Sequence, residues 1–155
     1  MPSSSPQEVE VLLPLLVSLG TILVTVVIHG IALIAVINFV RREFRLGRAG
    51  TRFWRNLAIV TAATQVALAA HLIEVAIWAR VLGLCGEFTS FAAAFYHSAM
   101  NYTSLGYGDV VMSPSWKLLG PLEAANGMLM FGISTAMIFA VIQRLVQPRI
   151  EHQRG

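Results

Sequence analysis

The sequence has little charge, and that charge is confined to a few places. Charged residues make up 12% of its 155 residues and hydrophobic residues 56%, whereas soluble domains usually carry about 25% charge. With a mean hydropathy of +0.70, a water-soluble fold would lack the polar surface it needs. The composition therefore indicates a membrane protein.

The sequence also has a single cysteine and no catalytic motif. Cys85 alone excludes a disulfide within the chain, and one thiol cannot form a metal site. There is no Ser-His-Asp order or phosphate-binding loop, and HLIE at His71–Glu74 lacks the second histidine of a helical zinc motif. We therefore expect neither an enzyme nor an organic cofactor.

Three apolar stretches, Val11–Val40, Leu57–Leu84 and Leu118–Leu145, lie between the charge clusters. Each exceeds the roughly 20 residues with which a helix crosses a bilayer, so we predict an all-α membrane protein with three spanning helices. The expected order is a tail at 1–10, a helix at 11–40, a basic loop at 41–56, a domain at 57–146 with its first helix at 57–84 and its last helix at 117–146, and a tail at 147–155.

Nine of the 11 lysines and arginines lie at or after the end of the first or the last apolar stretch. The two exceptions are Arg80 and Lys117. The positive-inside rule then places the loop 41–56 and the C-terminus in the cytoplasm and the N-terminus outside, as expected for the inner membrane of a prokaryote. Because the basic residues adjoin the spans, we expect anionic lipids rather than nucleic acid as their partner, with Phe44, Phe53 and Trp54 at the interface.

The segment between the second and third spans is too apolar for a simple loop. Residues 88–102 predict a helix with Thr89 or Ser90 as its N-cap, and at ~1.5 Å per residue it would enter the membrane without crossing it. The non-helical residues 103–109 that follow must be buried in protein or line a watery path.

Two glycines allow the segment 103–109 to bind a dehydrated cation. Gly106 and Gly108 can take positive φ at little cost, so successive carbonyls can point at one axis and replace the water shell of the ion. Closing each ring of oxygens requires four chains, which predicts a homotetramer. The expected ligands are the carbonyls of Ser104, Leu105, Gly106 and Tyr107 and the Ser104 hydroxyl, with Asp109 at the outer mouth.

The segment FYHSAMNYTSLGYGDVVMSP resembles the pore helix and selectivity filter of potassium channels, whose filter reads T-V-G-Y-G. The resemblance runs from Phe88 to about Leu145. It includes GMLMFGISTA at Gly127–Ala136, which is similar to the inner helix of bacterial potassium channels of the two-helix type. It implies a homotetrameric potassium-selective channel, passive conduction, and potassium binding along Thr103–Gly108; the first span is additional to this unit.

Two filter positions depart from the family pattern. Ser104 stands in the place of threonine and keeps the hydroxyl but loses the methyl group, and Leu105 replaces valine and changes the packing behind the filter. A weakly selective cation channel is therefore an alternative. From another class, a non-conducting membrane subunit that regulates another protein is a further one.

On the last span, the resemblance places Gly127 at the position of a hinge glycine. Residues at helical spacings beyond it would face the cavity or the adjacent subunit; these are Met128, Phe131, Thr135 and Phe139. Phe139 could form the narrowest apolar ring, or its ring could turn away and serve ordinary packing. Gly132 could permit close helix approach.

Ionisable residues at membrane depth are uncommon and suggest function. His71 and Glu74 share a helix face, and we expect Glu74, with His71, to contact the pore helix near His97 or Asn101, either as a pH-dependent modulator or as a permanent interhelical bridge.

Two further polar residues, Glu123 and Asn126, are expected to buttress the pore helix from behind, with a pore-lining Glu123 as the alternative. His29 in the first span is expected to be a packing residue rather than a sensor.

Overall fold

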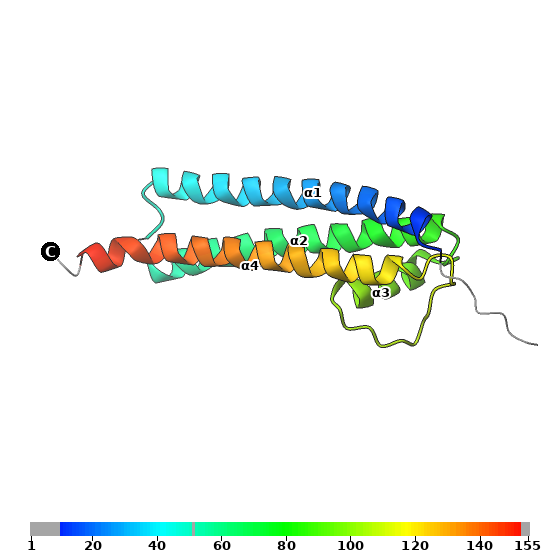
Figure 1. The fold of residues 1–155 in the computed structure, drawn as a ribbon. Helices are drawn as coiled ribbons and strands as arrows, with labels where there is room; N and C mark the ends of the chain where they lie inside the picture. The colour runs from blue at the N-terminus through cyan, green and yellow to red at the C-terminus, as the bar shows by residue number, and fades with distance from the viewer. Residues whose placement is uncertain (1–9, 51, 153–155) are drawn as a thin grey trace, which may run out of the picture. The chain divides into compact units, whose positions relative to one another are not determined.

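The computed structural model describes residues 10–50 and 52–152, with the backbone alone for 147–152. Within these residues it has four helices and no strand: α1 (Leu12–Arg45), α2 (Phe53–Leu84), α3 (Phe91–Tyr102) and α4 (Leu119–His152) (Figure 1). The predicted all-α fold class is confirmed. The parts of the expected tails at 1–9 and 153–155 lie outside the described residues.

Three of the helices have the length and apolar composition to cross a membrane: Leu12–Arg45, Phe53–Leu84 and Leu119–Val146. Polar side chains within α1 bond to the helix itself, since Ser18 and Thr21 donate to the carbonyls of Pro14 and Val17 at 2.7 and 2.8 Å. The helix therefore satisfies these hydroxyls without water, as a bilayer requires.

The first helix is longer than expected. It continues beyond Val40 to Arg45, so Arg41, Arg42 and Arg45 belong to its last turns and not to a loop. At ~1.5 Å per residue, α1 is about 50 Å long and exceeds the ~30 Å hydrocarbon core. The following loop is closed by the Asn56 side chain, which accepts from the Gly50 amide at 2.9 Å.

The chain divides into two compact units. Unit 1 comprises the residues up to Val26 and Ile73–Leu129, and unit 2 comprises Val27–Leu72 and the residues from Met130 onward. The helices α1, α2 and α4 each contribute one part to each unit, whereas α3 and the loop after it belong to unit 1.

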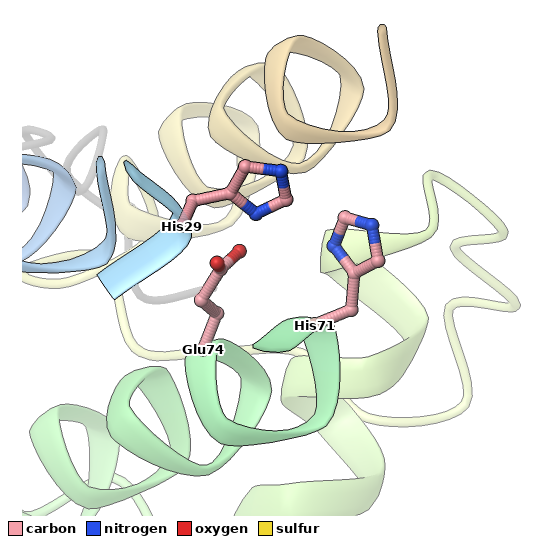
Figure 2. A group of neighbouring side chains, drawn as sticks. All are labelled: His29, His71 and Glu74. Carbon is pink, nitrogen blue, oxygen red and sulfur yellow. The ribbon is translucent and has the colours of Figure 1, made fainter. Parts of the chain in front are cut away.

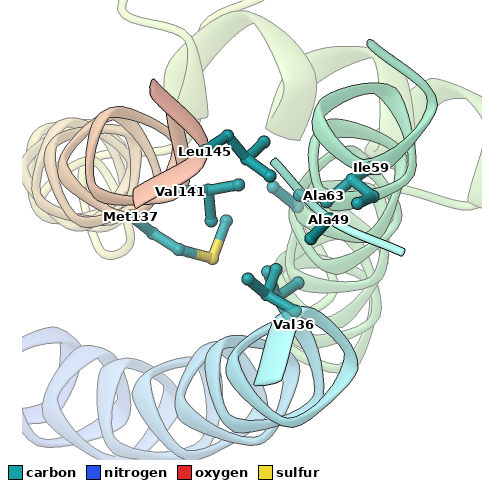
Figure 3. Packing of buried hydrophobic residues seen from close by; sticks show 9 residues of the cluster. Val36, Ala49, Ile59, Ala63, Met137, Val141 and Leu145 are labelled. Atoms are coloured by element: carbon teal, nitrogen blue, oxygen red, sulfur yellow. The ribbon is translucent and has the colours of Figure 1, made fainter. Parts of the chain in front are cut away.

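The main cluster of unit 2 is apolar. Side chains from α1, from the loop that follows it, from α2 and from α4 meet in this cluster, shown in Figure 3: Val36, Val40, Ala49, Ile59, Ala63, Ala67, Met137, Val141 and Leu145. Ala63 and Ala67 are small enough for the helices to approach closely, which favours van der Waals packing between helices in lipid.

The core of unit 1 is mixed. Its largest fully buried side chains include the apolar Trp78, Leu82 and Leu119, but also the carboxyl groups of Glu74 and Glu123. The α3 helix begins after Ser90, which occupies the N-cap position without a capping side-chain hydrogen bond. The polar part of this core lies behind the segment expected to bind ions.

Candidate functional site

The segment after α3 turns its amides back onto the helix. The amides of Ser104 and Leu105 donate to the carbonyls of Asn101 and Met100 at 2.8 and 2.9 Å, and the Gly106 amide donates to Met100 at 3.2 Å. Among the described residues, no backbone amide donates to a carbonyl of 104–107. These carbonyls are therefore available to an external ligand.

Every second residue of this segment has a positive φ. The values are 59° for Ser104, 51° for Gly106 and 74° for Gly108, as predicted for the two glycines. A β-branched residue is strongly disfavoured in this region, so serine fits position 104 with less strain than the threonine of the resembling family.

The outer face of the segment is not covered by its own chain. Leu105 and Tyr107 are 52% and 68% exposed, although large apolar and aromatic side chains usually pack against protein. A single chain therefore forms only one wall of any ion path.

Asp109 is fixed from behind. The Tyr96 hydroxyl on α3 donates to its carboxylate at 2.9 Å. A second contact ties the loop before α4 to the turn that follows α2, because the amide and hydroxyl of Ser113 donate to Glu87 at 2.8 and 2.5 Å. The non-helical segment is thereby attached to α3 and to this turn.

The α3 helix is bonded to α2 through two residues four positions apart. The Tyr102 hydroxyl donates to the Glu74 carboxylate, and the Ser98 hydroxyl lies 2.9 Å from the Val75 carbonyl. Glu74 therefore contacts α3 near Asn101, as expected, and Ser98 and Tyr102 form the face that α3 turns toward α2.

On its other side, α3 is bonded to α4 through Glu123, which is fully buried. Its carboxyl contacts the Ser98 hydroxyl, and the Asn101 amide lies 3.4 Å from it. The hydroxyl has one proton but two neighbouring acceptors, Glu123 and the Val75 carbonyl, so both contacts are satisfied together only when the carboxyl of Glu123 donates. Glu123 faces the back of α3, as the buttress expectation requires and the pore-lining alternative does not.

Gly127 touches the C-terminal end of α3. A Cβ at this position would lie 2.0 Å from the Tyr102 carbonyl oxygen, far inside van der Waals contact. The α4 helix continues without a break through Gly127. Steric need alone therefore explains this glycine, while its role as a hinge stays a prediction.

Asn126 bonds to a different helix from the one expected. Its amide donates to the Thr25 hydroxyl on α1 at 2.9 Å, with both groups buried. The expected contact with α3 is thus replaced by one with the additional first helix.

His97 on α3 packs beside the Phe88 ring, with the ring centroids 5.0 Å apart. It is 7% exposed, and its Nε2 has no hydrogen-bond partner among the described residues.

In unit 2, two imidazoles and a hydroxyl form a buried chain across three helices. The Nε2 atoms of His71 on α2 and His29 on α1 lie 3.0 and 3.1 Å from the Ser134 hydroxyl oxygen on α4, and Figure 2 shows both rings. The centroid of the His71 ring also lies 4.4 Å from the centroid of the Phe131 ring. His71 therefore contacts the last helix, a contact that was not predicted.

The residues expected to line the cavity are exposed in the single chain. Met128 is 59% exposed, Phe131 38% and Phe139 60%. The Thr135 hydroxyl donates to the Phe131 carbonyl at 2.8 Å. The role of Phe139, as the narrowest apolar ring or as a packing residue, stays a prediction, and Gly132 has open space around it.

Four residues that hold the site were not predicted from the sequence: Tyr96, Ser98, Tyr102 and Ser134. Ser98 and Tyr102 share the four-residue spacing of one helix face, which could have indicated two anchor points on α3. Ser134 had no such signal.

Residues 70–144 match the family model described as "Ion channel". The match begins within α2 and covers α3, the non-helical segment 103–109 and most of α4, whereas α1 lies outside it. Searches of the curated proteins and of the solved structures found no match. The described residues thus form an all-helical protein with three helices that could span a membrane, and the match over residues 70–144 suggests ion conduction.

Proposed function

We propose that the chain assembles as a homotetramer and conducts potassium ions passively and selectively through rings of backbone carbonyls. The observation that carries this proposal is the backbone of Ser104–Gly108. Its amides at 104–106 donate to the end of α3, and positive φ recurs at every second residue. This geometry turns the amides of residues 104–106 toward the end of α3 and leaves the carbonyl oxygens without backbone donors, which suits a cation.

The proposed ligands are the carbonyls of Ser104, Leu105, Gly106 and Tyr107 within the filter Thr103–Gly108. The C-terminal, partially negative end of α3 would add favourable potential for a cation, and Asp109 would add negative charge at the outer mouth. The exposed Leu105 and Tyr107 are the surfaces on which neighbouring subunits would pack.

Potassium flux into proteoliposomes, with sodium as the competing ion, tests the proposal. We expect potassium-selective flux that is lost in Gly106→Ala, because alanine is disfavoured at a φ of 51°. Gly132→Ala is the matched control, since neither glycine has an atom within 4 Å of an added Cβ. Equal sodium and potassium flux would point to a weakly selective pore.

Native mass spectrometry of the purified protein tests the assembly. A stable homotetramer is the expected species. A monomer or dimer without flux would contradict the proposal and favour the non-conducting regulatory subunit.

We further propose that the segment between α1 and α2 is cytoplasmic, on the side opposite to Cys85. The thiol of Cys85 is half-buried, and burial, followed by the Glu87 carboxylate, raises its pKa. Membrane-impermeant maleimide added outside inner-membrane vesicles of native orientation should label it, faster as the pH rises and the thiolate forms. Arg48→Cys in a Cys85→Ser background should label only after permeabilisation; the reverse pattern would invert the topology.

A further inference from the structure

Three guanidinium groups converge on one cavity in unit 2. The cavity has a volume of about 450 Å³ and is lined by Asn38, Arg41, Phe44, Arg45 and Arg144. Asn38, Arg41 and Arg45 lie at spacings of three and four, so they form one face of α1. Arg144 comes from α4, and its guanidinium lies over the Phe44 ring, 5.2 Å from the centroid.

Among the residues that the structure describes, no acidic side chain lines the cavity beside the three guanidinium groups. Like charges brought together repel one another, and the arrangement is relieved when an anion binds between them. Guanidinium groups present several N–H donors in a plane and suit phosphate oxygens.

An apolar groove adjoins this cavity and shares Arg41 and Arg144 with it. The groove has a volume of about 150 Å³. Its other lining residues are all apolar: Leu33, Ile37 and Val40 on α1, and Met137, Ala140 and Val141 on α4. A free phosphate would use the charged cavity alone, whereas a phospholipid would use both parts.

Helix electrostatics explain only part of the cluster. Arg42 and Arg45 lie in the last turn of α1, where positive charge compensates the partial negative charge of the helix end. That reason does not cover Arg144, which belongs to another helix, nor does it explain the apolar groove.

We propose that Arg41, Arg45 and Arg144 bind the phosphate headgroup of an anionic phospholipid whose acyl chain lies in the adjoining groove between α1 and α4. This sharpens the expectation of lipid binding at the basic segment to one site. Binding does not require conduction, so it can be tested whether or not the proposed channel activity holds.

The test is titration of the purified full-length protein in detergent with phosphatidylglycerol, followed by native mass spectrometry. Neutralising a guanidinium near a lipid headgroup typically lowers affinity about fivefold, so Arg41→Gln with Arg144→Gln should lower it about 25-fold. The matched control, Arg42→Gln with Arg48→Gln, removes the same charge away from the cavity and should change affinity less than about twofold. Equal losses in both pairs would overturn the site in favour of diffuse attraction.

Two further arms separate the ligand sources. Phosphatidylcholine should bind weakly to the parent protein; equal binding would contradict an anion site. Ala140→Phe, which fills the apolar groove, should weaken phosphatidylglycerol and leave inorganic phosphate unaffected. If inorganic phosphate displaces the lipid at equal concentration, the site is one for free phosphate and the proposal fails. Arg144→Lys keeps the charge but loses the guanidinium over Phe44, and an intermediate affinity is expected.

Discussion

The cores of the two units differ in chemistry although the same three helices contribute to both. Unit 1 buries the carboxyl groups of Glu74 and Glu123 with hydroxyl partners, whereas the main cluster of unit 2 consists of apolar side chains such as Ala63 and Met137. Directional bonds fix the rotation and depth of a short helix, which apolar packing alone specifies less well. The difference teaches that rigidity is concentrated where α3 and the non-helical segment must be positioned.

The largest effect is expected from Gly127→Ala in unit 1. The new Cβ would lie 2.0 Å from the Tyr102 carbonyl oxygen, and backbone atoms cannot rotate away as a side chain does. Overpacking usually costs about 1–3 kcal/mol, and we expect the upper end of that range, measured as a fall in thermal midpoint in detergent. Gly132→Ala should leave the midpoint unchanged; equal midpoints for both variants would refute the contact.

Next in size is Glu123→Ala. It removes the acceptor of Asn101 and the partner of Ser98, and unsatisfied buried polar groups cost about 1–3 kcal/mol. We expect a loss of about 2–3 kcal/mol in chemical unfolding. Glu123→Gln keeps the shape and a donor for Ser98 and should cost about 1 kcal/mol. If both variants lose stability equally, the hydrogen bonds are not what matters.

A smaller loss is expected from Tyr102→Phe, which removes the hydroxyl bonded to Glu74. The buried bond should be worth about 1–2 kcal/mol. Tyr96→Phe deletes the same atom from the exposed bond to Asp109 and should cost less than about 1 kcal/mol. The thermal midpoints of the two variants measure this difference. A larger loss for Tyr96→Phe than for Tyr102→Phe would contradict it.

The smallest effect is expected in unit 2. Ser134→Ala removes the hydroxyl bonded to His29 and His71, and interhelical hydrogen bonds in membranes average only about 0.6 kcal/mol. Thr135→Ala, whose hydroxyl bonds its own helix, should be neutral within about 0.5 kcal/mol. If Ser134→Ala proves as costly as Glu123→Ala in the same assay, the contrast between the two cores does not hold.

The sequence predicted the number and order of the helices because apolar length and charge placement determine which segments can span a membrane. It also predicted positive φ at Gly106 and Gly108, because left-handed residues that alternate with ordinary ones let successive carbonyls point toward one axis. Both features depend on local chain properties.

The partners of buried polar residues were harder to predict. Glu74 contacts α3 near Asn101 as expected, but its partner there, Tyr102, was not predicted, nor was the contact of His71 with Ser134. Helical periodicity tells which residues share a face, but not how far a short helix is rotated about its own axis. A rotation of α3 by one residue, about 100°, is enough to exchange one set of partners for another.

The polar contacts of α1 matter for the choice of truncated forms of this protein. The family match begins at residue 70, yet Thr25 bonds to Asn126, and His29 bonds to Ser134. A fragment excised at the homology boundary would carry an amide and a hydroxyl toward lipid without these α1 partners. We therefore expect a fragment that begins at residue 70 to be less stable than the full chain, because the first helix supplies these two polar partners.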